Sequence, residues 1–442
     1  PDLVYLDMTK EEFSAKITAS ENVRSISRKK SPKYNFISVS RSEKDNYTNE
    51  GWEVDRENVS SIRLKKLKLH SEVFENKVWS VFYKMGYERL NIDNTFKIPY
   101  SSNPSIPPRQ IDVFCFDDDT AIVIECKSSE TRRNRPLQTI INDFANIKVG
   151  IIRYLNNIFE TRKKVKLILA TNNIIVSEND VNRIKENNIL LFTQDDINYY
   201  EQLSSHLGEA SKYQLFGRIF FGQSIPSLKN KVPAIRGKMG GHTYYSFSIQ
   251  PEKLLKLSYI LHNNTTSEEV VGTYQRMVNK KRITEIGVFL DSNDGGSGFF
   301  PNSVIVNFDT NGRNLVFDKI SSDHDVEDCS VGVLKLPDKF RSAFIIDGQH
   351  RLLALRQVVQ GLEGGEGEFQ NDVPQDEVSV MFIELANSAK TRNIFTAVNR
   401  YAKSTTAGQN YAIDNTDGYA IVNRKIIDDI IPLARINTTG SA

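Results

Sequence analysis

The sequence predicts a mixed α/β fold, of the α+β kind, in which helices pack on sheets in successive modules. In the first half, short apolar strand segments alternate with helical patterns. In the second half, the composition favours strands joined by glycine turns. The length of 442 residues suggests two or three domains. We therefore expect a basic N-terminal arm over residues 1–69, a first domain over 70–205 and a second domain over 215–442.

Two apolar runs on either side of Asp117-Asp118-Asp119 organise the first domain. An antiparallel hairpin around this turn brings Asp112, which opens the first run, to the same end as Glu125 and Lys127, which close the second. Carboxylates favour hard cations such as Mg²⁺ or Mn²⁺, with phosphate and water completing the shell. Such an ion can activate water for phosphodiester cleavage. Asp112 and Glu125 are therefore candidate catalytic metal ligands, and Lys127 is a candidate to orient or deprotonate the attacking water.

Helices and strands are expected around this hairpin in a regular order. An amphipathic helix begins near Phe74 and stops at Gly86, and a second covers Leu137–Phe159. Further strands are expected over 165–173 and 188–192. The alternative interpretation is that the acids of the hairpin belong to an ordinary solvated turn without a function of their own.

The residues from about His70 to Leu203 resemble the PD-(D/E)XK nuclease superfamily, especially its Mrr-like restriction branch. Asp112 matches the first acid, and Glu125-Cys126-Lys127 matches the (D/E)-x-K string, although the proline that often precedes the first acid is absent. The resemblance implies a restriction-endonuclease-like mixed sheet flanked by helices. It also implies an auxiliary acid on the first helix, for which Glu75 is the first candidate and Glu72 the second. A homodimer is expected by the same resemblance, and a fold that has lost cleavage is the alternative.

Composition limits the class of protein. The formal net charge is only +2, so any nucleic-acid surface must be local. The three cysteines form no CxxC pair, which argues against structural zinc and a disulfide framework. No bilayer-spanning apolar run and no signal peptide is visible, so we expect a cytoplasmic protein without a membrane partner. Because the sequence begins at Pro1 and ends at Ala442, we expect a fragment or a chain that lacks some loops.

Basic residues gather in three places. They are either solvated flanks or contacts to DNA phosphates beside the hairpin. The groups are Arg24, Arg28, Lys29, Lys30 and Lys33; Arg63, Lys65, Lys66 and Lys68; and Arg132, Arg133 and Arg135.

The second domain contains an apolar strand that runs into Asp347-Gly348-Gln349-His350-Arg351 and then into an apolar-spaced helix. Free backbone N–H groups at a helix N-terminus favour an anion, and His350 and Arg351 add positive charge. From spacing alone, a strand–turn–helix with a capping aspartate is the better explanation of this segment.

The literal string Asp347–Arg351 is the name-giving motif of the DGQHR-domain family, which is similar to DndB and, more distantly, to the ParB/sulfiredoxin-like fold. The resemblance covers roughly Phe216 to Ala442, including the segments Val232–Gly237, Phe300–Val306 and Phe395–Arg400. It implies a nucleotide- or DNA-binding site and a nucleotide such as ATP, GTP or CTP. The residues so implied are Asp347, Gln349, His350 and Arg351, with Arg236, Asn399 and Arg400 as further contributors. An ordinary helix C-cap is the alternative for Asn399-Arg400, and the absence of a Walker pattern argues against a P-loop NTPase.

Three functions remain open. The first is a Mg²⁺-dependent DNA endonuclease of a prokaryotic DNA-modification and restriction system that acts in anti-phage defence. Its second domain would sense DNA, chemically modified or not, together with other modification or restriction proteins. The second is a non-cleaving DNA-binding regulator. The third is an NTP-hydrolysing accessory factor centred on His350 and Arg351.

Overall fold

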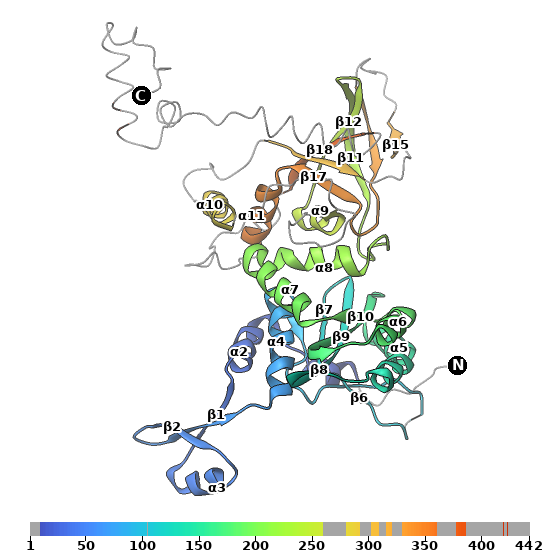
Figure 1. Cartoon of the computed structure of the whole chain (residues 1–442). Helices are drawn as coiled ribbons and strands as arrows, with labels where there is room; N and C mark the ends of the chain where they lie inside the picture. Colours follow the sequence, from blue (N-terminus) through green and yellow to red (C-terminus); the bar gives the residue numbers. More distant parts are fainter. Residues whose placement is uncertain are drawn as a thin grey trace. The chain divides into compact units, whose positions relative to one another are not determined.

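The computed structural model describes residues 9–103, 105–259, 280–291, 302–308, 315–320, 329–359 and 377–385, together with Tyr419 and Val422. The chain divides into one compact unit, Pro1–Leu385, and a second, Ala386–Ala442. Every helix and strand discussed below belongs to the first unit (Figure 1).

The N-terminal arm contains ordered helices and a small sheet. The helices α1 (Lys10–Ala15) and α2 (Ser20–Lys30) precede an antiparallel sheet with the strand order β1-β3-β2. Its elements are β1 (Tyr34–Val39), α3 (Lys44–Asn49), β2 (Glu53–Glu57) and β3 (Ile62–Leu67). Val39, Ile62 and Leu64 form a core that belongs to this sheet alone. The small sheet therefore has a core of its own, which the polar composition of the arm did not suggest, whereas Phe13 of α1 and Val23 of α2 pack in the two hydrophobic clusters of the central sheet.

The predicted hairpin is the centre of a five-stranded mixed sheet with the order β10-β9-β8-β7-β4. Its two strands are antiparallel, with Val113 opposite Ile124, and β8 then runs parallel to β9. The strands are β4 (Arg89–Leu90), β7 (Val113–Phe116), β8 (Thr120–Asn134), β9 (Lys164–Ile175) and β10 (Leu190–Phe192), with the separate pair β5 (Lys97–Ile98) and β6 (Arg109–Gln110) before β7. Both strands predicted downstream are confirmed.

Helices cover the two faces of this sheet because alternate residues of each strand point to opposite sides. Ile122 and Ile124 of β8 belong to the hydrophobic cluster that includes α4 and α7, whereas Val123 packs in the cluster that includes α5. The helices are α4 (His70–Lys84), α5 (Gln138–Ile158), α6 (Glu178–Glu186) and α7 (Gln194–Leu207). As predicted, α4 stops before Gly86, whose φ of 91° suits glycine. Cys115 and Cys126 are buried free thiols, as expected for core positions.

The described residues beyond 210 form a second layered structure around a mixed sheet. Its strand order is β13-β17-β14-β18-β12-β11-β16-β15. The strands are β11 (Lys231–Met239), β12 (His242–Ile249), β13 (Ser258–Tyr259), β14 (Val304–Phe308), β15 (Val316–Lys319), β16 (Ser330–Lys335), β17 (Ala343–Asp347) and β18 (Val378–Ile383). The helices are α8 (Ser211–Ile219), α9 (Pro251–Leu257), α10 (Lys280–Asp291) and α11 (Gln349–Val359). The helix α9 ends at Leu257, because the next residues, Ser258–Tyr259, pair with β17.

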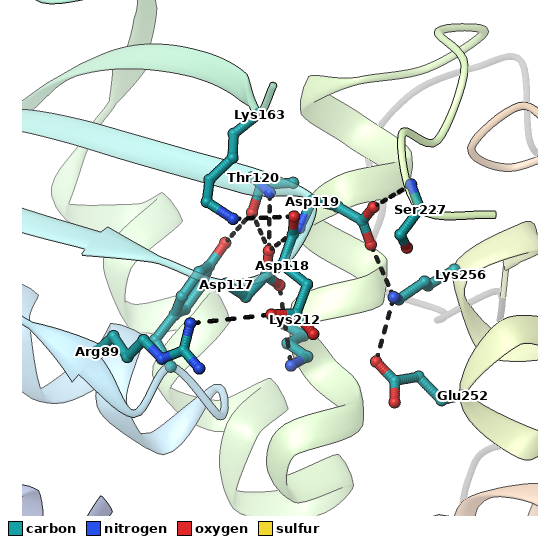
Figure 2. Close-up of polar contacts among 11 residues, drawn as sticks. Arg89, Asp117, Asp118, Asp119, Thr120, Lys163, Lys212, Ser227, Glu252 and Lys256 are labelled. Atoms are coloured by element: carbon teal, nitrogen blue, oxygen red, sulfur yellow. Dashed lines mark hydrogen bonds and ion pairs between the residues drawn. The ribbon is translucent and has the colours of Figure 1, made fainter. Parts of the chain in front are cut away.

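The three-aspartate turn contacts residues of this second layered structure (Figure 2). Asp119 Oδ2 lies 2.7 Å from Lys256 Nζ in α9, and Asp119 Oδ1 accepts a hydrogen bond from the backbone N–H of Ser227. The Asp119 side chain is 1% exposed. Burial alone would raise the pKa of Asp119, but Lys256 and Ser227 bring it below its ordinary value. One continuous hydrophobic cluster also extends from Phe74 to Phe382, so the two predicted domains share a core.

Candidate functional site

The hairpin register brings the three predicted side chains together at one end of the central sheet. Asp112 directly precedes β7, and Glu125 and Lys127 lie on β8. Lys127 Nζ is 2.7 Å from Glu125 Oε1 and 3.9 Å from Asp112 Oδ2. All three point to the same edge because Val113 pairs with Ile124, which leaves Asp112 beside Glu125.

The backbone holds Asp112 firmly in this place. Its Oδ2 accepts a 2.7 Å hydrogen bond from the backbone N–H of Cys126, and its carbonyl accepts one from the side-chain amide of Asn91. Asn91 is fully buried and also accepts from the N–H of Phe114, so it fixes the start of β7. Burial, followed by the charge of Glu125, raises the pKa of Asp112 to about 6. Two carboxylates are thus held together at an electrostatic cost.

The structure places Glu75 of α4 beside this pair. Burial, followed by the charge of Asp112, raises the pKa of Glu75 to about 7. Its Oε2 accepts a 2.8 Å hydrogen bond from the side-chain amide of Asn94. Glu72, the second candidate, accepts instead from Asn35 of β1. Of the two candidates for an auxiliary acid, Glu75 is therefore the one that lies beside Asp112.

Two further basic residues lie near the site: Arg109, which was not identified from the sequence, and Lys30, which was named only among the candidate phosphate contacts. Arg109 Nη2 lies 3.5 Å from Glu125 Oε1, and Lys30 Nζ donates to Asn94 Oδ1 at 3.2 Å. Burial lowers the pKa of Lys30 to about 8. Arg109 lies just before the first apolar run, and this position could have identified it as a residue of the site. Lys30 differs from the exposed cations of its group because α2 turns its side chain toward Asn94 and Asn76.

The donor set fits a hard divalent cation held by few protein ligands. In the described residues, no three His, Cys, Asp or Glu side chains form a metal-binding group by themselves. Mg²⁺ commonly uses one or two carboxylates and takes its other ligands from water and phosphate. Asp112 and Glu125 supply such a pair of carboxylates. The Lys127 amine, which contacts Glu125, also donates a 3.0 Å hydrogen bond to the backbone carbonyl of Cys126. Crowded carboxylates with a raised pKa are a common property of such sites.

All three of the predicted basic groups have exposed members, and in the first of them these are Arg24, Arg28, Lys29 and Lys33. Arg132 and Arg133 are exposed at the far end of β8, beyond Lys127. In the arm, Arg63 is exposed on β3, whereas Lys68 is buried and donates to the backbone carbonyls of Lys29 and Lys30. Lys68 therefore serves the fold of the arm.

The DGQHR segment forms the predicted strand–turn–helix, from β17 into α11. Gly348 has a φ of 93°, and a Cβ there would stand 3.1 Å from a methyl carbon of Val304, so glycine is required on two grounds. Arg351 lies 3.0 Å from Asp347 Oδ2 and donates to the backbone carbonyl of Asn302. These contacts give Asp347, Gly348 and Arg351 a structural role. Gln349 is buried, and His350 is half-buried beside it.

Arg236, which was also assigned to this second site, does not join it. Arg236 lies on β11, separated from β17 by three strands, which corresponds to roughly 19 Å. Its guanidinium is 6.0 Å from the centre of the Phe317 ring. The glycines that follow it, Gly240 and Gly241, form the β11–β12 hairpin turn, each with a positive φ. Asn399 and Arg400 lie outside the described residues.

Comparison with known families bears on the second half of the chain. Residues 232–439 match the family model described as DndB, DNA-sulfur modification-associated. The C-terminal part is DndB-like. The match agrees with the motif read at Asp347–Arg351 and links the DndB-like part to DNA-modification systems. It does not reach the central sheet.

Other comparisons add little. No curated protein matches this chain. Two solved structures show weak similarity: protein VC1899 from Vibrio cholerae (12% identity, TM-score 0.24, 44% of this chain and 52% of that chain) and Can2 from Sulfobacillus thermosulfidooxidans in complex with cyclic tetra-adenylate (13%, 0.23, 45% and 60%). The chain thus spans between half and two thirds of each, and similarity at this level does not establish a common fold. Within the described part of the chain, no helix combines the length and apolar character needed to cross a bilayer.

Proposed function

We propose that this protein is a Mg²⁺-dependent DNA endonuclease of a DNA-modification and restriction system. In this proposal the central sheet cleaves DNA and the DndB-like part senses it. The observation that carries the proposal is the cluster of Asp112, Glu125 and Lys127 at one sheet edge, with Lys127 Nζ within 4 Å of both carboxylates. Its order along the hairpin resembles the PD-(D/E)XK pattern, and the match to a DNA-modification family supplies the biological context.

The residues have distinct roles in this reaction. Asp112 and Glu125 would hold the metal, which supplies an activated water and neutralises charge on the phosphate. Lys127 orients the attacking water through its amine. Glu75, which burial and Asp112 leave close to half protonated near neutral pH, exchanges a proton with that water or with the leaving group. Arg109 holds Glu125 in place.

The test uses the full chain with supercoiled plasmid DNA, with and without phosphorothioate linkages, in Mg²⁺ or Mn²⁺ and with or without ATP, GTP or CTP. Cleavage should fall by at least about 10³-fold in Asp112→Asn and in Lys127→Met. The matched control is Asp118→Asn, which changes an exposed acid on the same hairpin. Absence of cleavage by the unaltered protein under every condition would refute the nuclease assignment.

A non-cleaving DNA-binding regulator is the second candidate. It is favoured by the short contact between Lys127 and Glu125, which partly neutralises the cluster without any metal. DNA binding without products in every condition would support it. An NTP-hydrolysing accessory factor is less favoured, because Arg351 already binds Asp347 and the carbonyl of Asn302. Phosphate release that Asp347→Ala abolishes would restore it.

A further inference from the structure

The small sheet of the arm has its aromatic side chains on the face opposite its core. Val39, Ile62 and Leu64 pack together on one side. Side chains alternate along a strand, so Tyr34 and Phe36 of β1 project from the other side. Both are 37% exposed. A sheet this small would gain stability by burying such rings, and it leaves them accessible.

Each exposed ring is accompanied by a cation from β3. The Arg63 guanidinium carbon lies 4.2 Å from the centre of the Phe36 ring, and Lys65 Nζ lies 5.3 Å from that of Tyr34. The strand register explains the arrangement, because Phe36 pairs with Lys65 and Tyr34 pairs with Leu67 across the β1–β3 ladder. Each cation is therefore the diagonal neighbour, on the same face, of the ring that it contacts. Aromatic faces and positive charge thus alternate over a few ångströms.

We propose that the face formed by Tyr34, Phe36, Arg63 and Lys65, here called the aromatic platform, binds single-stranded DNA. Unpaired bases stack on the two rings while the two cations contact backbone phosphates. Proteins that bind single strands recurrently combine stacking rings with a positively charged track. The inference rests on the proposed function only in taking DNA as the nucleic acid.

The pairing of each exposed ring with a cation favours a nucleic acid as the partner, although the acids of β2 partly compensate both cations. The acids of this sheet lie on β2, where Asp55 Oδ2 is 3.4 Å from Arg63 Nε and Glu53 pairs with Lys65. The platform is therefore the β1–β3 half of the sheet. The apolar surface of this face consists of the two rings and Leu67, which is 64% exposed and pairs with Tyr34. A docking site for a protein would present a larger contiguous apolar patch, whereas here a cation adjoins each ring.

The connection between β3 and α4 relates the platform to the candidate active site. Only Lys68 and Leu69 separate β3 from His70, the first residue of α4. His70 Nδ1 lies 3.2 Å from Ser128 Oγ, and Ser128 follows Lys127. The strand that supplies the platform cations therefore ends close in sequence to a contact with the site. This arrangement suits a site that acts on DNA with an unpaired segment.

The experiment measures binding of the full chain to a fluorescein-labelled 15-nucleotide single strand by anisotropy, in EDTA so that no metal-dependent cleavage occurs. Tyr34→Ala and Phe36→Ala should each weaken binding by about tenfold, and Phe36→Trp should keep wild-type affinity. Lys65→Gln should reduce the dependence of log K on log salt by about 0.7. Val59→Ala is the matched control, because Val59 is an apolar residue of the same sheet's β2–β3 turn and is 97% exposed.

Unchanged affinity in both alanine variants, with circular dichroism spectra like that of the unaltered protein, would overturn the proposal. A shift of the sedimentation profile from dimer to monomer in these variants would also overturn it, by showing that the face joins two copies of this chain. Because binding is measured without metal, the platform can be confirmed in a protein that never cleaves DNA. Conversely, if both variants keep full affinity for the single strand and full cleavage of DNA, the platform proposal fails while the nuclease assignment stands.

Discussion

The two ends of the β7–β8 hairpin carry acidic residues in opposite electrostatic situations. At the turn, Asp119 is buried against Lys256 and the N–H of Ser227, and its pKa lies below the ordinary value. At the other end, Asp112 is held beside Glu125, and burial and that neighbour raise its pKa to about 6. Acids that hold a fold together are compensated, whereas acids placed for chemistry are kept under mutual repulsion. The contrast is between a compensated ion pair at one end and two repelled carboxylates at the other, where we propose that the chemistry takes place.

Removing the charge at the turn should have the largest effect on stability. Asp119→Asn leaves Lys256 buried with Glu252 as its remaining partner, so we expect a loss of roughly 2–4 kcal/mol in the free energy of unfolding. Urea denaturation followed by circular dichroism measures it. Because the pKa of Asp119 is depressed in the fold, its contribution is present at neutral pH and is lost as the pH falls through that depressed value. Equal stability of variant and parent at pH 7 would show that Lys256 and Ser227 do not stabilise the charge of Asp119.

The same substitution at the other end should have the opposite sign. Asp112→Asn removes a repelled charge, so we expect stabilisation by about 1–3 kcal/mol at pH 8 in EDTA. A raised pKa means that the folded protein retains a proton that the unfolded chain has released. The gain should therefore be complete above pH 6 and should disappear as the pH falls toward 4. Destabilisation at pH 8 would contradict the comparison.

Mg²⁺ should stabilise the protein through the Asp112 end of the hairpin alone, and its effect on the free energy of unfolding should be smaller. At a Mg²⁺ concentration tenfold above its dissociation constant, binding to the folded state adds about 1.4 kcal/mol. We expect thermal unfolding of the unaltered protein to shift upward, and the shift to vanish in Glu125→Gln. Asp118→Asn is the control that should retain it. A shift that persists in Glu125→Gln would place the cation elsewhere.

The smallest effect is expected at the exposed member of the turn. The Asp118 side chain is 76% exposed and lies 3.8 Å from Arg89 Nη1. Surface pairs of this kind contribute little, so Asp118→Asn should change the free energy of unfolding by less than about 0.5 kcal/mol. The same urea titration measures this difference. A larger loss would mean that all of the turn acids, and not Asp119 alone, are structural.

Local pattern predicted the parts of the site that lie on one hairpin and one helix. Two continuous apolar runs on either side of a short turn predict the register that brings Asp112 beside Glu125, and helical spacing before Gly86 correctly located α4. Nuclease activity, the metal and the nucleotide stay predictions. The domain limits also stay predictions, although the shared hydrophobic cluster joins both halves in one compact unit.

Features that depend on distant pairing were not accessible to pattern. Lys256 follows Asp119 by more than a hundred residues, and nothing near either one indicates the ion pair. Arg236 was grouped with the DGQHR segment because strand order was unknown, and β14, β18 and β12 lie between them. Likewise, only the packing of α2 turns Lys30 from a surface cation toward Asn94.

The ion pair at the turn also governs how the protein can be dissected. A truncation after residue 205 would strip Lys256 and Ser227 from Asp119 and uncover Tyr87, whose ring meets Phe216 at 6.3 Å. The truncated protein would expose an acid without its ion-pair partner and an aromatic side chain without its packing neighbour. Poor solubility on expression would then be a consequence of the truncation. Useful boundaries fall beyond Leu385, or require the acid to be neutralised first.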